Sequence, residues 1–255
     1  MVWMDTHCHL DAPEFDQDRS EILNQMQIHQ IEALVLPAVY FAAWPAIVKL
    51  NQQQPRCYAS FGFHPIYLAQ HQPQQLKELT TWLLEHRAVA VGECGLDFYL
   101  PELEVQAQEE WFIAQIRIAC ELDLPLIIHA RRSTDAVLKC LRRFPSAKGV
   151  IHSFAGSTQQ AELLVKQGFY LGVGGTITYE RAQRLRAAIQ AMPLEFLVLE
   201  TDAPDQPDSQ WRGKRNDLSR LPVIAQALAD LRQESLATIA QATTANAKRL
   251  FNLPE

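Results

Sequence analysis

Residues 125–152, PLIIHARRSTDAVLKCLRRFPSAKGVIH, contain one complete repeat of the predicted fold. The apolar runs 125–128 and 149–151 show little alternation with polar residues, which predicts strands buried on both faces. Residues 134–143 between them have apolar positions spaced for a helix. A strand, a helix and a second strand in this order indicate two parallel strands of one sheet.

The same alternation continues along the whole chain. Eight such units favour closure into a (β/α)8 TIM barrel, a fold of about 250 residues, so one domain over residues 1–255 is expected; a doubly wound open sheet is the alternative. Strands are predicted at residues 2–5, 33–39, 58–63, 88–92, 125–128, 149–151, 169–173 and 196–199. Helices are predicted at 18–29, 104–121, 134–143, 158–167, 179–191, 218–232 and 236–250, the last packed against the outside of the barrel.

The composition narrows the class of protein. Hydrophobic residues make up 48% of the 255 residues, and the net charge is −6. Such a surface does not coat duplex nucleic acid non-specifically, because that binding needs many Lys and Arg. Five cysteines without a C-x-x-C pair indicate a reducing cytoplasm. No apolar run is long enough for a membrane span, and nothing demands a protein partner, so a monomer is expected.

Six residues with metal-ligating side chains come at or just after predicted strands. His7 and His9 follow the first strand, where alternate residues point the same way. In a barrel all carboxyl ends of the strands meet at one rim, so residues distant in sequence converge there. Without partners, so many buried polar groups would be costly, whereas a metal cluster would satisfy them together. The other four residues are Glu93, His129, His152 and Asp202.

Imidazole and carboxylate ligands suit zinc, iron, manganese or magnesium. Two divalent ions about 3.5–4 Å apart that share a hydroxide would fit two-metal hydrolysis. Asp202 would orient this hydroxide and accept its proton. In the predicted division one ion is held by His7, His9 and Asp202, the other by His129 and His152, and Glu93 bridges both.

Glu200 and four further residues are expected near the predicted metals. Glu200 shares a strand face with Asp202, so it either supports or supplies a ligand or is a buried ion-pair partner. His64 follows the third strand, and Arg131 suits bidentate phosphate contact unless an acidic neighbour pairs with it. Gly156 and Ser157 open a helix that either binds an anion or is simply capped there.

Aromatic side chains and one long loop are also expected near the barrel mouth. Residues 202–216, DAPDQPDSQWRGKRN, predict a loop over the mouth, and loops of this length are often functional. Aromatic residues near the barrel mouth are candidates for stacking on a base, although most Phe and Trp residues belong to the core. These candidates are Phe63, Tyr99, Phe154 and Trp211.

At these residues the chain resembles the TatD family of metal-dependent deoxyribonucleases, within the amidohydrolase-like barrels, and most of all its YjjV-like branch. The resemblance implies a metal site at the six residues above and phosphodiester hydrolysis, as an exonuclease on single-stranded DNA. Glu93 takes the place of the carboxylated lysine of other barrel relatives, and Ile66 stands where the family often has a second His. The matching segments are MDTHCHLD, GFHP, VGECGLDF, PLIIHAR, GVIHSFAGS, GVGGTIT, LVLETDAP and NAKRLFNL.

Three functions are compatible with the sequence. The first is a deoxyribonuclease with a two-metal site, and the second is a hydrolase of small esters, lactones or amides that uses the same metals. Arg131, His64 and the helix start at Gly156 favour a phosphate substrate over the second. The third is a non-catalytic module that binds metal. Such a module has no evident need for all six ligands.

Overall fold

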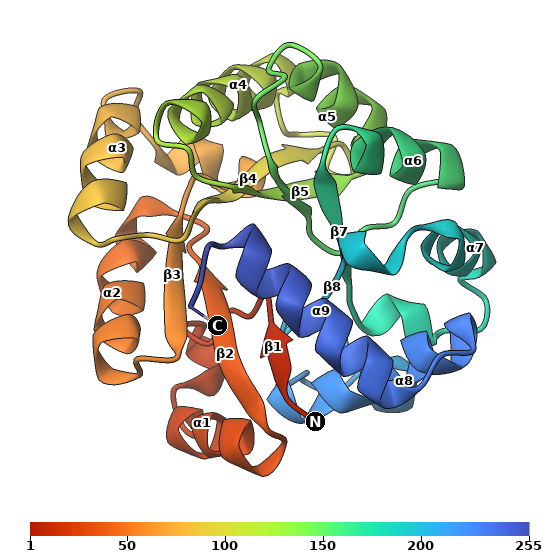
Figure 1. The fold of residues 1–255 in the computed structure, drawn as a ribbon. Helices are drawn as coiled ribbons and strands as arrows, with labels where there is room; N and C mark the ends of the chain where they lie inside the picture. Colours follow the sequence, from red (N-terminus) through yellow and green to blue (C-terminus); the bar gives the residue numbers. More distant parts are fainter. Residues whose placement is uncertain (255) are drawn as a thin grey trace.

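Eight parallel strands pair in chain order in the computed structural model, which describes residues 1–254. Every ladder from the first strand to the eighth is parallel, and the helices lie outside the strands (Figure 1). The strands are β1 (Trp3–Asp5), β2 (Ile31–Pro37), β3 (Cys57–Phe61), β4 (Ala90–Asp97), β5 (Leu126–Arg131), β6 (Gly149–Ile151), β7 (Phe169–Val173) and β8 (Leu197–Leu199).

Backbone hydrogen bonds join the chain after β1 to the end of β8 and to the residues that follow it, and complete the ring. Thr6 N donates to Leu199 O over 3.0 Å, and Asp202 N donates to His7 O over 2.8 Å. These bonds leave no open edge of the sheet at this end, which distinguishes a barrel from an open twisted sheet. The predicted (β/α)8 barrel is therefore confirmed, and the doubly wound alternative is not.

The outer helices cover the sheet and bury its outward-facing side chains. The outer helices are α1 (Arg19–Ile28), α2 (Trp44–Gln53), α3 (Gln75–Glu85), α4 (Val105–Glu121), α5 (Thr134–Leu141), α6 (Thr158–Lys166), α7 (Gln183–Ala191) and α8 (Leu221–Arg232).

The structure differs from the predicted elements in two ways. The helices α2 (Trp44–Gln53) and α3 (Gln75–Glu85) are absent from the predicted set, and β4 and β5 extend further than predicted. Glu93 and His129 therefore lie inside strands and not at their ends.

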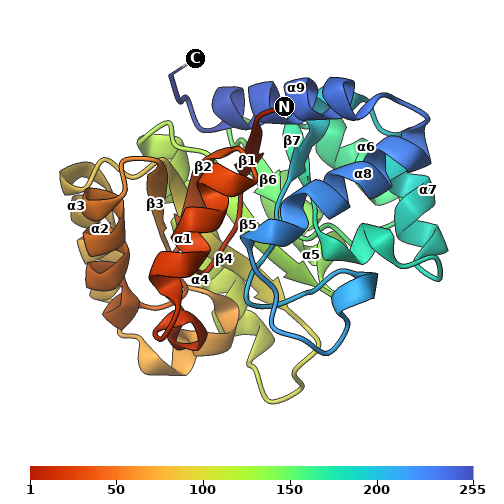
Figure 2. The ribbon, with the colours of Figure 1, turned by 90° about the horizontal axis from the view of Figure 1, so that it is seen from below.

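The last helix, α9 (Leu236–Leu250), crosses the amino ends of the strands (Figures 1 and 2). The Asn246 side-chain amide donates to the carbonyls of Leu194 and Leu197, each over 2.8 Å. Ala247 and Leu250 of α9 pack on side chains inside the barrel. The prediction that this helix packs on the outside is therefore wrong. The strand residues of that cluster are Met4, Ala33, Val35, Ala90, Ile127, Val150 and Val198.

Because α9 closes the amino end, the open end of the barrel is the one where the strands finish. At that end Gly95 brings β4 against β5: a Cβ built on it would lie 2.1 Å from the carbonyl oxygen of His129, and its φ is +135°. Glycine is the residue that tolerates both conditions. This close approach holds the backbones that carry Glu93 and His129 beside each other.

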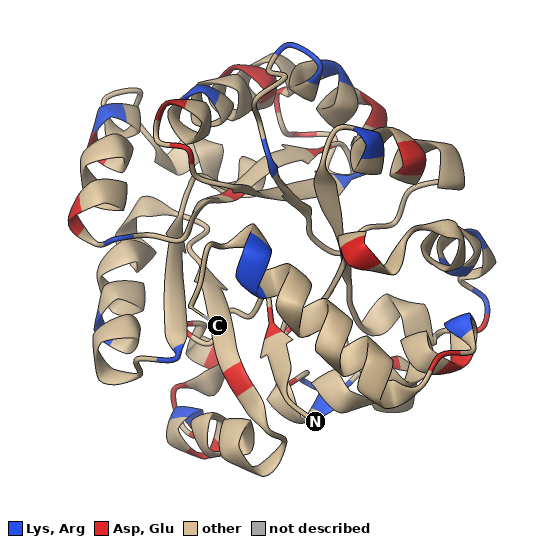
Figure 3. Cartoon of the chain, viewed as in Figure 1, with Lys and Arg blue, Asp and Glu red and all other residues tan. Residues whose placement is uncertain are grey.

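Charges of both signs are mixed over the outer helices. Figure 3 shows Lys and Arg positions interspersed with Asp and Glu positions along the helices around α9. Within residues 1–254, no helix combines the length and the apolar character of a membrane span.

Candidate metal centre

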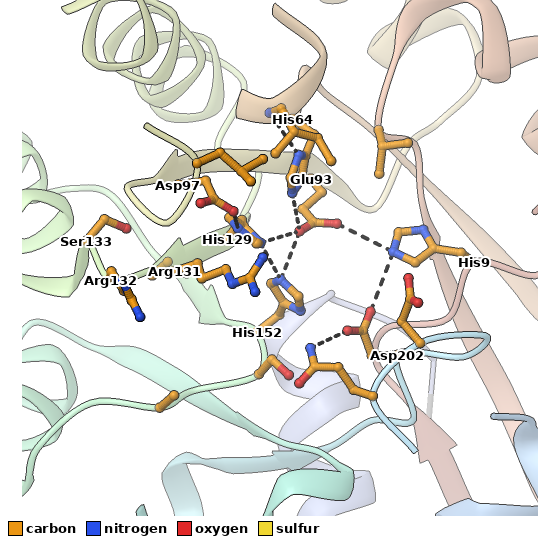
Figure 4. A pocket seen from close by; sticks show the side chains of 18 of the residues that line it. His9, His64, Glu93, Asp97, His129, Arg131, Arg132, Ser133, His152 and Asp202 are labelled. Atoms are coloured by element: carbon orange, nitrogen blue, oxygen red, sulfur yellow. Dashed lines mark hydrogen bonds and ion pairs between the residues drawn. The ribbon is translucent and has the colours of Figure 1, made fainter. Parts of the chain in front are cut away.

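The six predicted ligands lie together at the open end of the barrel, and Figure 4 shows five of them, all except His7. They come from five different strands or the turns that follow them. The convergence follows from the parallel topology, since every strand finishes at this rim. Their role as metal ligands stays a prediction. The strands or turns contribute His7 and His9 after β1, Glu93 in β4, His129 in β5, His152 after β6 and Asp202 after β8.

The Glu93 carboxylate lies at the centre of the cluster. Its Oε1 is 2.8 Å from Nε2 of His152 and 3.1 Å from Nδ1 of His129. Its Oε2 is 3.2 Å from Nε2 of His7. Burial alone would raise the pKa of Glu93, but the surrounding imidazoles outweigh it and hold the pKa well below its usual value. An ionised carboxylate with its two oxygens facing two groups of imidazoles is suited to bridge two cations.

A second group consists of His7, His9 and Asp202. The Nε2 atoms of the two histidines are 3.1 Å apart, and Oδ1 of Asp202 is 3.5 Å from each. The other carboxylate oxygen of Asp202 accepts a hydrogen bond from the Gln206 amide. Burial would raise the pKa of Asp202, but the hydrogen bond from His9 and the nearby imidazoles lower it to about 2. Asp202 therefore also presents an ionised oxygen to the cluster.

Two buried carboxylates face the histidines from behind. Oδ2 of Asp97 is 2.9 Å from Nε2 of His129, so this ring turns its Nδ1 toward Glu93. Glu200 accepts from the backbone N–H of Ser153, and its Oε1 is 3.7 Å from Nδ1 of His152. Glu200 thus lies behind a candidate ligand. The sequence reasoning did not single out Asp97, although it lies four residues after Glu93 and so on the same face of β4.

His64 contacts the same oxygen of Glu93 as His129 and His152. Its Nε2 is 3.2 Å from Oε1 of Glu93, and its Nδ1 accepts from the N–H of Ile66. An accepting Nδ1 leaves the proton of the neutral ring on Nε2. Burial lowers the pKa of His64 to about 4, against the raising effect of Glu93 and with help from His129. His64 is therefore a neutral donor directed at the centre of the site.

The arrangement of donor atoms fits divalent metals. Two pairs of imidazole nitrogens approach each other, His7 with His9 at 3.1 Å and His129 with His152 at 3.2 Å. Such an approach needs a proton or a cation that both nitrogens share. Imidazole nitrogen and carboxylate oxygen are ligand types that zinc and manganese accept. Three sets of three residues have their ligand atoms within 4.8 Å of one another: His7, Glu93 and His152; His7, His9 and Asp202; His64, Glu93 and His129.

A cavity of about 1540 Å³ opens over the cluster. One wall carries Asp11, Glu14 and Asp205, from the chain after β1 and after β8. Across the barrel from β1, the end of β5 carries two arginines, and a third comes from α7, between β7 and β8. These basic residues are Arg131, Arg132 and Arg184.

The predicted substrate contacts have different outcomes. His64, Arg131 and Gly156 line the cavity. The Ser157 hydroxyl instead accepts from Gln160 N in a capping box at the start of α6, which is the alternative interpretation of that motif. Arg131 does not pair with a carboxylate among the described residues but lies over Tyr99, 3.6 Å from the ring centre.

The other aromatic candidates lie away from the cavity. Phe63 and Phe154 are only 1% exposed and belong to the core, so the prediction that they stack on a base is wrong. Trp211 does not line the cavity and packs near the Arg220 guanidinium. Of the loop 202–216, only Asp202, Pro204, Asp205 and Gln206 reach the cavity. The remainder bends back to the barrel, where the Asn216 side chain donates to Thr201 O.

A (β/α)8 barrel with histidines and carboxylates clustered at its carboxyl end defines a metal-dependent hydrolase. A family model described as TatD related DNase matches residues 4–252, and the chain belongs to the TatD family. The resemblance seen in the sequence motifs is thereby confirmed.

Relatives in both comparisons cover almost the entire chain. The uncharacterized metal-dependent hydrolase YjjV of Escherichia coli (strain K12) is 37% identical over 255 residues, which is 99% of this chain and 98% of that protein. The crystal structure of YjjV, a TatD homologue from Escherichia coli K12, superposes with a TM-score of 0.95 at 36% identity and covers 99% and 98% of the two chains. The Escherichia fergusonii protein named 3'-5' ssDNA/RNA exonuclease TatD is 30% identical over 262 residues, 98% of each chain.

Proposed function

We propose that this hydrolase is a nuclease that cleaves phosphodiester bonds of single-stranded DNA with the help of two divalent ions. The observation that carries the proposal is the buried carboxylate of Glu93, which lies among histidines at the floor of a wide cavity that three arginines help to line. A relative of similar length is named as an exonuclease of single-stranded DNA and RNA, which supports the same substrate class and exonucleolytic action.

The two ions would be held by the residues that converge on Glu93. One would take His7, His9 and Asp202, the other His129 and His152, with Glu93 between them. Such ions supply charge stabilisation at the phosphoryl oxygens and lower the pKa of water. Zinc, manganese and magnesium are all candidates for the ions.

The protein's own side chains have separate tasks in this proposal. Oδ1 of Asp202 orients the attacking water and accepts its proton, because the Gln206 amide occupies the other oxygen. The neutral His64 ring donates its Nε2–H to an oxygen of the reacting phosphate. Arg131, which has no carboxylate partner among the described residues, offers planar N–H donors to the same group.

The size of the cavity favours a polymeric substrate over a small one. Sites for small ligands are typically about 300–1,000 Å³, and this cavity of about 1540 Å³ is larger. A small ester, lactone or amide would leave much of it filled with water. The alternative of a small-molecule hydrolase on the same metals therefore takes second place, and a non-catalytic metal-binding module third.

The test uses the purified chain and an end-labelled single-stranded oligonucleotide. We expect cleavage with added magnesium or manganese, loss of cleavage with a chelator, and recovery when metal is returned. Rapid turnover of a lactone panel without any oligonucleotide cleavage would favour the small-molecule hydrolase. Metal binding without turnover of any substrate would favour the binding module.

We also propose that the chain acts in the cytoplasm as a monomer. The five cysteines are all free thiols in the structure, four of them buried. Free buried thiols agree with a reducing compartment.

A further inference from the structure

We propose that Arg131 and Arg132, both held by the ring of Tyr99, bind successive phosphates of the strand, Arg131 the scissile one and Arg132 the next. The uncleaved strand would then leave the metal centre over β5 and α5. This inference rests on the proposed nuclease function and names the part of the cavity that holds the substrate strand.

The two arginines share one aromatic support. Cζ of Arg131 lies 3.6 Å and Cζ of Arg132 lies 4.7 Å from the centre of the Tyr99 ring. The Tyr99 backbone N–H donates to Oδ1 of Asp97 over 2.8 Å, which ties this support to the residue behind His129. A guanidinium over an aromatic face keeps its N–H edges free for other partners. Tyr99 thus fixes two cationic groups without using their hydrogen-bond donors.

The guanidinium groups of these two arginines are not held in ion pairs. Other arginines of the chain form ion pairs, as Arg220 does with Asp208 at 2.6 Å and Arg232 with Glu234 at 2.9 Å. Among the described residues, Arg131 and Arg132 form none. Unpaired guanidinium groups at the mouth of a site, in a chain of net charge −6, are available to an anionic ligand.

Their positions suit successive phosphates. Arg131 is the last residue of β5, two residues after His129. Arg132 follows it with a left-handed φ of 56°, and in Figure 4 the two side chains point to different parts of the pocket. One arginine is thus directed near the metal centre and the other farther along the same wall, as a strand with regularly spaced phosphates requires.

The opposite wall would repel the same strand. Asp11, Glu14 and Asp205 line the cavity on the side of His9. Phosphates placed there would face like charges, which is unfavourable in a partly desolvated site. Asp135 also lines the cavity near the arginines, where its Oδ1 accepts a hydrogen bond from the Gln160 amide over 2.8 Å. With two arginines against this one carboxylate, that side still offers the strand its exit, and the acidic side is left to a chain end without a further phosphate.

The test compares two substrates on matched variants. One substrate is a single-stranded oligonucleotide; the other is bis(p-nitrophenyl) phosphate, a phosphodiester without neighbouring phosphates. We expect Arg132→Gln to raise KM for the oligonucleotide about tenfold, the size of one lost charge-assisted contact, with kcat changed far less. The slope of log(kcat/KM) against log salt should become shallower by about 0.7 for the lost phosphate contact.

The positioning role of Tyr99 has its own pair of variants. Tyr99→Leu removes the ring, so KM for the oligonucleotide should rise about threefold, which corresponds to the weaker values for a cation–π contact. Tyr99→Phe keeps the ring and should restore the KM and the salt slope of the natural chain. Arg249→Gln, at the other end of the barrel, removes one positive charge and should change neither.

Three results would overturn the inference. They are equal losses on both substrates for Arg132→Gln, an unchanged salt slope, or an effect of Arg249→Gln as large as that of Arg132→Gln. If the natural chain cleaves no oligonucleotide, the nuclease function fails, and the arginines are tested by fluorescence anisotropy with the labelled oligonucleotide. Binding weakened about tenfold in Arg132→Gln would support the arginine site alone; equal binding, or none by the natural chain, would refute it.

Discussion

Oδ2 of Asp97 lies 2.9 Å from Nε2 of His129 and fixes which nitrogen of that ring faces Glu93. His7 and His152 present Nε2 to Glu93, whereas His129 presents Nδ1. Carboxylates that accept from the rear nitrogen of a ligating histidine hold its tautomer and its orientation. Asp97 should therefore control metal affinity without touching the ions.

Replacement of Asp97 by Asn tests this relationship. The amide is a weaker acceptor for the His129 ring. We therefore expect the affinity of the protein for the ion beside His129 and His152 to fall about tenfold to a hundredfold. Activity should recover at high metal concentration. Metal titration by calorimetry measures the change, and Asp123→Asn, an exposed carboxylate that pairs with Lys148, is the matched control. Equal affinities in both variants would show that Asp97 only fills space.

Glu93→Gln removes the charge that two sets of imidazoles share. We expect a loss of metal-dependent activity of more than about a hundredfold, the upper size of effect for residues that merely support a ligand. Metal content should fall and the circular dichroism spectrum should stay that of the natural chain. Glu110→Gln on the exposed side of α4 should leave activity intact. Activity near that of the natural chain in Glu93→Gln would rule out the bridging role.

Much of the barrel could be predicted because its strands are distinct in sequence. The runs 149–151 and 169–173 match β6 and β7 residue for residue, since they lack charged residues and are bounded by polar residues or glycine. Helices α2 and α3 are harder to recognise. In α3 the apolar residues are not confined to one face, because Leu84 is 63% exposed beside the buried Leu83.

The site was predictable where it follows from topology and unpredictable where it depends on side-chain direction. Ligand-type residues near strand ends must converge in a closed parallel barrel, and His152 and Asp202 do. The roles of Asp97 and Arg132 could not be predicted, because they depend on which neighbouring residue each side chain contacts. The position of α9 could not be read from its amphipathic pattern either, because an apolar face fits the outside of a barrel and its closed end equally well.

Gly95 and Gly168 form a matched pair for testing how β4 and β5 hold the site. Both have positive φ, but a Cβ on Gly95 would lie 2.1 Å from His129 O, whereas nothing lies within 4 Å of one on Gly168. We expect Gly168→Ala to cost about 1 kcal/mol from backbone strain alone. Gly95→Ala should cost about 3 kcal/mol or more, since steric overlap adds to that strain. Urea unfolding measures both, and similar costs would mean that the close approach of the two strands is unimportant.

The most direct measurement of the central claim is anomalous X-ray scattering from crystals of the chain loaded with manganese or zinc. Two peaks are predicted at the open end of the barrel: one beside His7, His9 and Asp202, the other beside His129 and His152, with the Glu93 carboxylate in contact with both. The absence of metal at these residues in fully loaded crystals, or metal bound only elsewhere on the protein, would contradict the account.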